Sequence, residues 1–477
     1  MQTKTFCSNS RTALSRRDAL QSLSAGFGFL AFAGLSSAQA AEESKNSALT
    51  PRKPHFEPKA KRVIFLCMRG GPSHVDTLDY KPRLKQDHGR ASNYGTPWMA
   101  SPWNFKQQGQ SGLWISELLP NLASHADDLC LLRGMHCDQP AHAQAMVQMH
   151  TGNFQFVRPS VGAWTLYGLG TENRNLPGYI SINPPTATGG AQNYGNAFLP
   201  AAYQGTKFTV QDSSQRNRMI DRLRRGEANP YGINNAVNGQ FSKSVQRSQL
   251  DLITALNREK LQQDKHNPLV EGAIENFELA FRMQDAVPEV MDLSGETEET
   301  QSLYGINEDS TDGFGRQRLL ARRFAESGVR FIELGHGSWD QHSNIQTALA
   351  SNCTETDKPI AGLLADLKRR DMLKDTLILW GGEFGRTPYS DSGTGRDHNH
   401  KGYTMWMAGG GVKGGFSYGA TDDHGYEAVE NKMHVHDWHA TILHLLGLDH
   451  ESLTYRYAGR EMRLTDVAGS VAHDVMA

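Results

Sequence analysis

Residues 62–76 have the sequence RVIFLCMRGGPSHVD, in which an apolar run ends at Gly70-Gly71-Pro72 and is followed by His74 and Asp76. A short apolar run that stops at glycine is typical of a buried parallel β-strand. In open α/β sheets, ligands bind outside the carboxyl ends of such strands. This stretch therefore predicts the fold class and marks the edge of the sheet where a functional site would lie.

Further stretches place polar residues beside apolar runs in the same way. WDQH (339–342) follows VRFIELG, GGEFGRTP (381–388) directly follows TLILW, and DHNH (397–400) lies shortly before YTMWMA. Because the carboxyl ends of parallel strands meet at one edge, we expect these segments to converge. Oxygen and imidazole donors together suit divalent metals such as zinc, manganese or iron. The sequence therefore predicts a metal site with these candidate ligands: His74, Asp76, Asp340, His342, Glu383, Asp397, His398 and His400.

Strand-like and helix-like segments alternate along most of the chain. We expect strands at 62–68, 129–132, 179–182, 329–334, 376–380 and 403–408, and helices at 141–150, 316–327, 357–371 and 436–446. This alternation predicts an α/β fold, a mostly parallel sheet with helices on both faces. Residues 211–287 differ, with long polar helical patterns and few β-branched residues, so we expect a helical insertion there.

The first forty residues have the character of an export signal. Arg16-Arg17 precedes a moderately apolar segment (19–35), and Ala38-Gln39-Ala40 supplies a cleavage site, which resembles a twin-arginine signal peptide. The alternative is a membrane anchor, but the segment is shorter than the roughly 20 residues needed to span a bilayer. We therefore expect cleavage, no stable membrane span afterwards, and a periplasmic or otherwise extracytoplasmic protein exported by the twin-arginine machinery.

The remaining chain is expected to form one domain. Residues 41–61 are polar and rich in proline, which predicts a flexible tether, and residues 62–470 form the predicted domain. The formal net charge of the 477-residue chain is −2, so nucleic acid is not an expected partner. An oxidising compartment permits disulfides. No C-x-x-C pair occurs, however, and we expect buried free thiols at Cys67, Cys130, Cys137 and Cys353.

Seven stretches in order resemble the alkaline phosphatase and sulfatase superfamily. They are those around 70–82, 339–344, 381–388 and 395–402, together with MHTG (149–152), AGGGVKGG (408–415) and VHDWHATILHLLGLD (435–449). More closely, they resemble a family of exported bacterial proteins of unknown function, family 1501, within that superfamily. The resemblance implies an alkaline phosphatase-like fold holding one or two divalent metals, which could be zinc, manganese, calcium or magnesium. It places the ligands at Asp76, Asp340 with His342, Glu383, and His398 or His400.

The sequence departs from the superfamily at several points. His74 could take the place of Asp76, and Phe384 stands where a ligating His would follow Glu383. The cysteine of the sulfatase segment C-x-P-x-R corresponds to His142, with Gln144 and Met146 at the Pro and Arg positions. No Ser or Thr occurs between His142 and His150. A formylglycine, serine or threonine nucleophile is therefore not predicted in this segment.

Two residues are candidates for catalysis. His142 could act as nucleophile or general base, or it could merely cap or pack its helix. Arg386 could bind a phosphate or sulfate group bidentately, or pair with Glu383.

We expect a metal-dependent hydrolase of phosphate or sulfate esters acting outside the cytoplasm, on a small-molecule or glycan ester. The alternative is a non-catalytic metal- or ligand-binding protein of the cell envelope on the same fold. Phosphoryl-mutase chemistry is a third option.

Overall fold

The computed structural model describes residues 48–210, 241–264 and 268–477. The chain divides into two units, Met1–Thr50 and Pro51–Ala477, and the second contains the domain. The predicted signal peptide and residues 41–47 of the predicted tether lie outside the described residues. From Arg52 to Lys61, however, backbone N–H groups donate to carbonyls of Leu169, Gly447, Leu445 and Asp375. The prediction of a free tether is wrong for this part, because its backbone bonds to the domain.

The domain is built on a nine-stranded sheet, in the order β12-β4-β11-β8-β1-β7-β5-β6 with β15 paired to β4. β1 is parallel to β7 and β8, and β5 is parallel to β7 and β6. β11 is antiparallel to both of its neighbours. The predicted mostly parallel α/β sheet is confirmed. The strands are β1 (Arg62–Met68), β4 (Leu129–His136), β5 (Tyr179–Ile182), β6 (Thr206–Phe208), β7 (Phe331–His336), β8 (Thr376–Gly381), β11 (Tyr403–Ala408), β12 (Phe416–Tyr418) and β15 (Met433–His434).

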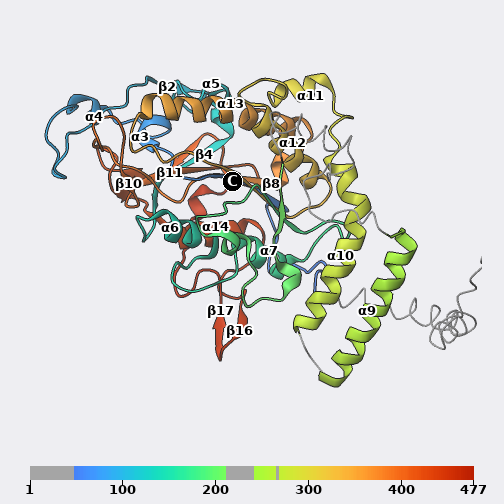
Figure 1. The fold of residues 1–477 in the computed structure, drawn as a ribbon. Helices are drawn as coiled ribbons and strands as arrows, with labels where there is room; N and C mark the ends of the chain where they lie inside the picture. The colour runs from blue at the N-terminus through green and yellow to red at the C-terminus, as the bar shows by residue number, and fades with distance from the viewer. Residues whose placement is uncertain (1–47, 211–240, 265–267) are drawn as a thin grey trace, which may run out of the picture. The chain divides into compact units, whose positions relative to one another are not determined.

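Helices cover both faces of this sheet (Figure 1). α5, α12 and α13 lie on one face, and α6, α7 and α14 lie on the other. Side chains of β1 alternate accordingly, because successive residues of a strand point to opposite faces. Ile64, Leu66 and Met68 pack in the core with α12 and α13, whereas the Phe65 ring meets Trp438 of α14. These helices are α5 (Pro120–Ala123), α6 (His142–Thr151), α7 (Val161–Leu169), α12 (Asp312–Glu326), α13 (Ile345–Arg369) and α14 (Val435–Leu445).

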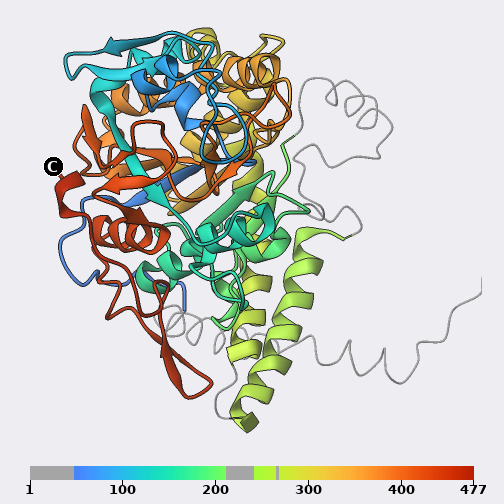
Figure 2. The same cartoon turned by 90° about the vertical axis from the view of Figure 1, so that its left-hand side faces the viewer.

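The predicted insertion is described in part. α9 (Lys243–Asp264) and α10 (Pro268–Met291) run side by side as a helical hairpin (Figures 1 and 2). Residues 211–240 lie outside the described part of the chain. Within that part, no helix combines the length and the apolar character needed to cross a membrane. Cys67, Cys130, Cys137 and Cys353 are buried free thiols, as expected.

Candidate metal centre

The direction of the strands brings the predicted site residues to one edge of the sheet. β1, β7 and β8 are parallel, and β4 runs with β8 because both are antiparallel to β11. The segments that follow these four strands therefore start from the same edge. β9 (Gly385–Arg386) pairs with β10 (His398–Asn399) and sets His398 opposite Arg386. Residues 250 positions apart can meet there for this reason.

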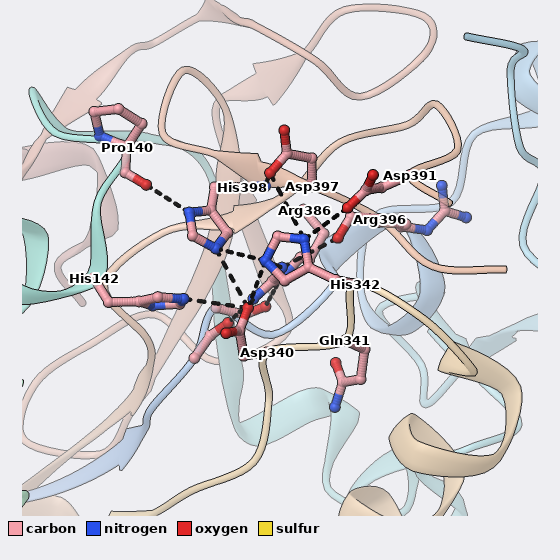
Figure 3. Close-up of polar contacts among 12 residues, drawn as sticks. Pro140, His142, Asp340, Gln341, His342, Arg386, Asp391, Arg396, Asp397 and His398 are labelled. Atoms are coloured by element: carbon pink, nitrogen blue, oxygen red, sulfur yellow. Dashed lines mark hydrogen bonds and ion pairs between the residues drawn. The ribbon is translucent and has the colours of Figure 1, made fainter. Parts of the chain in front are cut away.

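Three imidazoles converge on the carboxylate of Asp340 (Figure 3). Asp340 Oδ1 lies 3.2 Å from His142 Nε2, 3.0 Å from His342 Nε2 and 3.3 Å from His398 Nε2. His342 Nε2 and His398 Nε2 are 3.0 Å apart. The Asp340 and His342 side chains are 43% and 40% exposed. These four residues, the Asp340 cluster, therefore form a compact set of donors that solvent can reach.

The second nitrogen of each ring is held by an acceptor. The Nδ1 atoms of His142, His342 and His398 each lie 2.7 Å from an oxygen, of Glu383, Asp391 and the Pro140 carbonyl, respectively. Carboxylate and carbonyl oxygens only accept, so each Nδ1 carries the proton. The Nε2 of a neutral ring then presents its lone pair to Asp340, and buried His142 Nε2 lacks a hydrogen-bond partner of acceptable geometry. Because two lone pairs repel, an Nε2 that faces the Asp340 carboxylate must either carry a proton or bind a cation.

Several of the donor atoms have spacings that suit a divalent metal. Ligands at 2.0–2.1 Å on a tetrahedral zinc ion are separated by about 3.3 Å, close to the distances of Asp340 Oδ1 from the three Nε2 atoms. Metal-bound histidines usually donate their other ring N–H to a carboxylate or carbonyl, which fixes the tautomer. All three rings meet that condition. His142, Asp340 and His398 offer ligand atoms within 4.8 Å of one another and could therefore hold one divalent ion, with His342 beside them at 3.0 Å from Asp340 and from His398.

Neighbouring charged groups shift the pKa values of His142 and Asp340 in the cluster. Burial lowers the pKa of His142, but the adjacent carboxylates of Asp340 and Glu383 outweigh this effect and raise the pKa to about 9. Burial opposes ionisation of Asp340, yet His142, His398 and Arg386 together hold the pKa of this carboxyl far below its usual range. A proton on His142 and a metal ion would therefore compete for the same position.

Asp397 is a further carboxylate beside His342 and His398, on the solvent-exposed side of the cluster. Its side chain is 55% exposed, and Oδ1 lies 3.9 Å from His342 Nδ1. His342, Asp397 and His398 offer ligand atoms within 4.8 Å of one another. Asp397 also accepts a 2.7 Å hydrogen bond from the backbone N–H of His398. It is the oxygen donor at the open rim of the cluster.

Glu383 and Arg386 lie behind the cluster and orient it. Both Glu383 oxygens accept from the Gly70 N–H, at 3.0 and 3.1 Å, and Oε1 also accepts from His142. The fully buried Arg386 donates to Asp340, to Arg396 O at 3.1 Å, and to the carbonyls of Gly70 and Gly71. Its remaining Nη1 proton faces His342 Nε2 at 3.5 Å. The expectation that Arg386 binds a substrate anion, or pairs with Glu383, is not met, because its donors are already occupied.

Of the predicted ligands outside the cluster, Asp397 and Glu383 adjoin it, Glu383 as a partner of His142 rather than in a donor group of the described residues, and His74, Asp76 and His400 lie away from it. Gly70 and Gly71 have φ values of 115° and 79°, and after this turn α3 (His74–Thr77) carries its side chains into the protein interior. His74 Nε2 is 2.7 Å from Gly425 O, and burial lowers its pKa. Asp76 pairs with Arg396 at 2.7 Å, both side chains fully buried. His400 is absent from the donor groups of the described residues, and its carbonyl accepts from Cys137 N at 2.9 Å.

Two features were missed by the sequence reasoning. Asp391, which orients His342, lies in a polar loop after Pro388 with no apolar run to mark it. A second donor group, Cys67, His150 and Glu333, is buried within the sheet and α6. His150 belongs to the MHTG stretch (149–152), and this motif is the sequence signal that could have identified the group. His150 Nε2 lies 3.1 Å from Glu333 Oε1, and the Tyr179 hydroxyl donates to Glu333 Oε2 at 3.0 Å.

Solved structures of low sequence identity resemble the chain. An alkaline phosphatase from the Antarctic bacterium TAB5 is 10% identical, with a TM-score of 0.32, over 81% of this chain and 98% of that one. The sulfatase PsFucS1 from Pseudoalteromonas sp. is 12% identical, with a TM-score of 0.33, over 87% and 71%. The lipoteichoic acid synthase LtaP from Listeria monocytogenes is 9% identical, with a TM-score of 0.37, over 87% and 78%.

A search of curated proteins found no match. The profile of a family described as "Protein of unknown function (DUF1501)" matches residues 60–476. That match covers nearly all of the domain and includes every residue of the Asp340 cluster. The chain therefore belongs to the DUF1501 family.

Proposed function

We propose that this protein is a metal-dependent hydrolase of phosphate or sulfate esters that acts outside the cytoplasm. The observation that carries the proposal is the Asp340 cluster, in which three imidazole Nε2 atoms and one carboxylate meet at a partly exposed point. A divalent ion held there would supply Lewis acidity toward an ester oxygen or toward water. Zinc, manganese, calcium and magnesium remain the candidate ions.

The residues around the cluster favour water as the nucleophile. Burial raises the pKa of the Cys137 thiol to about 12, so it is not a thiolate at neutral pH. The Thr151 hydroxyl donates to Val147 O within α6. His142 has Nδ1 on Glu383 and Nε2 facing Asp340, which suits a metal ligand better than a free nucleophile. Our candidate to accept a proton from attacking water is Asp397, an exposed carboxylate beside His342.

The alternative function is a metal- or ligand-binding protein of the envelope without catalysis. Two observations support it: His142 takes the place of the superfamily's nucleophile, and Arg386 has no donor free for a substrate oxyanion. The hydrolase and a metal-binding protein both require the metal, so metal content alone does not separate them. Hydrolysis does.

The test combines metal analysis with an ester screen. Residues 41–477 should be purified, analysed for bound metal, and assayed with 4-nitrophenyl phosphate and sulfate esters and with sulfated and phosphorylated sugars. We expect bound metal and hydrolysis, both lost in Asp340→Asn and kept in Asp371→Asn, a control whose side chain is 77% exposed. Metal without hydrolysis of any ester would favour the binding protein. Absence of metal would refute the hydrolase and the metal-binding protein, and would leave only a ligand-binding protein.

We also propose export by the twin-arginine pathway, on the basis of Arg16-Arg17 and the Ala38-Gln39-Ala40 site. The pathway carries folded proteins, so a metal could be loaded before export. Replacing Arg16 and Arg17 with lysine should leave precursor in the cytoplasm. Normal export of that variant would refute the route.

A further inference from the structure

Five aromatic side chains from three loops form a half-exposed group, called here the aromatic rim. Tyr94 stacks on Tyr389, with centroids 4.9 Å apart and planes at 24°, and lies 4.3 Å from the ring of Tyr426. Trp98 stacks on His424 at 4.1 Å with planes at 8°. Tyr94 is 44% exposed, and the others are partly exposed. Rings that served only to pack loops would be expected to be buried, and these remain in contact with water.

The aromatic rim adjoins the Asp340 cluster through a shared segment. Tyr389 forms a β-bridge with Trp98, and Asp391 forms one with Gly395, so residues 389–391 are extended. Residues i and i+2 of an extended segment project to the same side. The ring of Tyr389 therefore lies on the side from which Asp391 reaches His342 at 2.7 Å. Asp397 also acts electrostatically on Tyr389, which places the rim beside the open part of the cluster.

The loops that carry the aromatic rim are fixed by hydrogen bonds. Both oxygens of Asp422 accept from successive backbone N–H groups, those of residues 424 to 427, at 2.7 to 3.1 Å. The N–H of Tyr94 donates to Ser92 Oγ at 3.0 Å. Rings held in this way lose little conformational freedom when a ligand binds. The rim is therefore preorganised as a binding surface.

The side chains of the aromatic rim favour one class of ligand. Tyrosine combines an apolar ring face with a polar tip, which matches the C–H faces and hydroxyl groups of a sugar. Asp391, Asp397, Asp422 and Glu427 lie nearby and make the surroundings acidic, which opposes polyanions such as nucleic acid. We propose that the aromatic rim is a carbohydrate subsite that binds neutral sugar rings of a glycan. Resting on the proposed function, the inference adds that the glycan's ester group is held at the Asp340 cluster.

The experiment measures binding separately from hydrolysis. Isothermal titration calorimetry of metal-loaded residues 41–477 would use neutral hexasaccharides of glucose, mannose and galactose. We expect at least one to bind with millimolar or better affinity. Tyr94→Ala should weaken that binding roughly tenfold, the effect of losing one aromatic stack worth about 1.4 kcal/mol. Tyr457→Ala should not, although Tyr457 is 48% exposed and stacks on Phe198.

Further variants separate the subsite from catalysis and from folding. Asp340→Asn should keep hexasaccharide binding even if it loses metal and hydrolysis, so failure of the hydrolase proposal would not imitate failure of this one. If a thermal melt shows that Tyr94→Ala is unfolded, Tyr426→Phe is used instead. We expect Tyr426→Phe to lower hexasaccharide affinity several-fold, because the hydroxyl group is missing. No binding of any hexasaccharide by the unmodified chain, or equal binding by the folded rim variant, would overturn the inference.

Discussion

The two groups of metal-type donors on this sheet differ in what surrounds them. Cys67, His150 and Glu333 are fully buried, whereas the side chains of the Asp340 cluster are between 20% and 43% exposed. In the buried group both His150 nitrogens and both Glu333 oxygens have protein partners. In the Asp340 cluster, three Nε2 atoms face one carboxylate oxygen at the protein surface. Residue types alone do not make a metal site; the orientation and exposure of their donor atoms do.

The buried group forms a neutralised pair rather than an empty site. Burial disfavours the charged ring of His150, but Glu333 outweighs this effect and raises the pKa of His150 well above its ordinary value. Burial also raises the pKa of the Cys67 thiol, so a thiolate ligand is disfavoured there. We therefore expect changes in the buried group to affect stability, and changes in the Asp340 cluster to affect metal binding.

The largest expected effect is loss of metal in Asp340→Ala. Asp340 Oδ1 contacts all three imidazoles, so its removal should lower metal affinity by more than the roughly 10–100-fold seen when an orienting partner is lost. Stability without metal should change less, because the side chain is 43% exposed. Metal titration with a competing chelator measures this effect. A variant that kept its affinity would show that the cluster does not hold the ion.

Glu333→Gln should lower the stability of the fold rather than its affinity for metal. Removing one partner of a buried pair typically costs about 3–5 kcal/mol, and we expect a loss near 3 kcal/mol because the amide oxygen still accepts a hydrogen bond. Urea unfolding measures the change, with the exposed Glu430→Gln as control. Metal content should be unchanged. Loss of metal with intact stability would reverse the assignment of the two groups.

An intermediate effect is expected for Asp391→Asn. Asp391 orients His342 from outside the cluster, and loss of such a partner costs roughly 10–100-fold in metal affinity. The same chelator competition tests it, with Asp423→Asn as an exposed control in a different loop. An unchanged affinity would mean that His342 does not ligate the ion, or that it ligates through the other nitrogen.

The smallest expected effect is a pH dependence specific to the buried pair. The folded-state pKa of His150 is raised, so the stability it contributes is complete below about pH 6.5, the unfolded value. That contribution is lost as pH rises through the folded pKa. The difference in unfolding free energy between the unmodified chain and Glu333→Gln should therefore shrink as pH increases above about 6.5. A difference that stays constant or grows would show that His150 is neutral.

Sequence patterning predicted the sheet better than it predicted the orientation of individual side chains. Residues 62–68, 179–182, 376–380 and 403–408 form strands within a residue of their predicted bounds. The helix predicted at 357–371 begins at Ile345 instead and includes Pro359. The antiparallel direction of β11 was not predicted, because an apolar run has the same composition in either direction.

At the candidate site, sequence indicated the edge and several of the donors, but not which of the predicted ligands meet. Asp340, His342 and His398 follow or precede strands whose ends meet, so the pattern could find them. His74 and Asp76 follow a strand equally well, yet the turn at Gly70 and Gly71 leads into a helix that faces the interior. Asp391 could not be found, because its partner His342 is 49 positions away and only the folded loop brings them together.

The sequence by itself determined the α/β class, the family, and the edge where imidazoles and carboxylates gather, because those follow from apolar periodicity and local motifs. Tertiary structure alone decided which nitrogen of each ring is free, that Arg386 supports Asp340 rather than a ligand, and that His150 is neutralised in the interior. These properties depend on hydrogen bonds and burial between distant segments. Local sequence patterns do not specify such contacts, because they form only when distant segments meet in the folded chain.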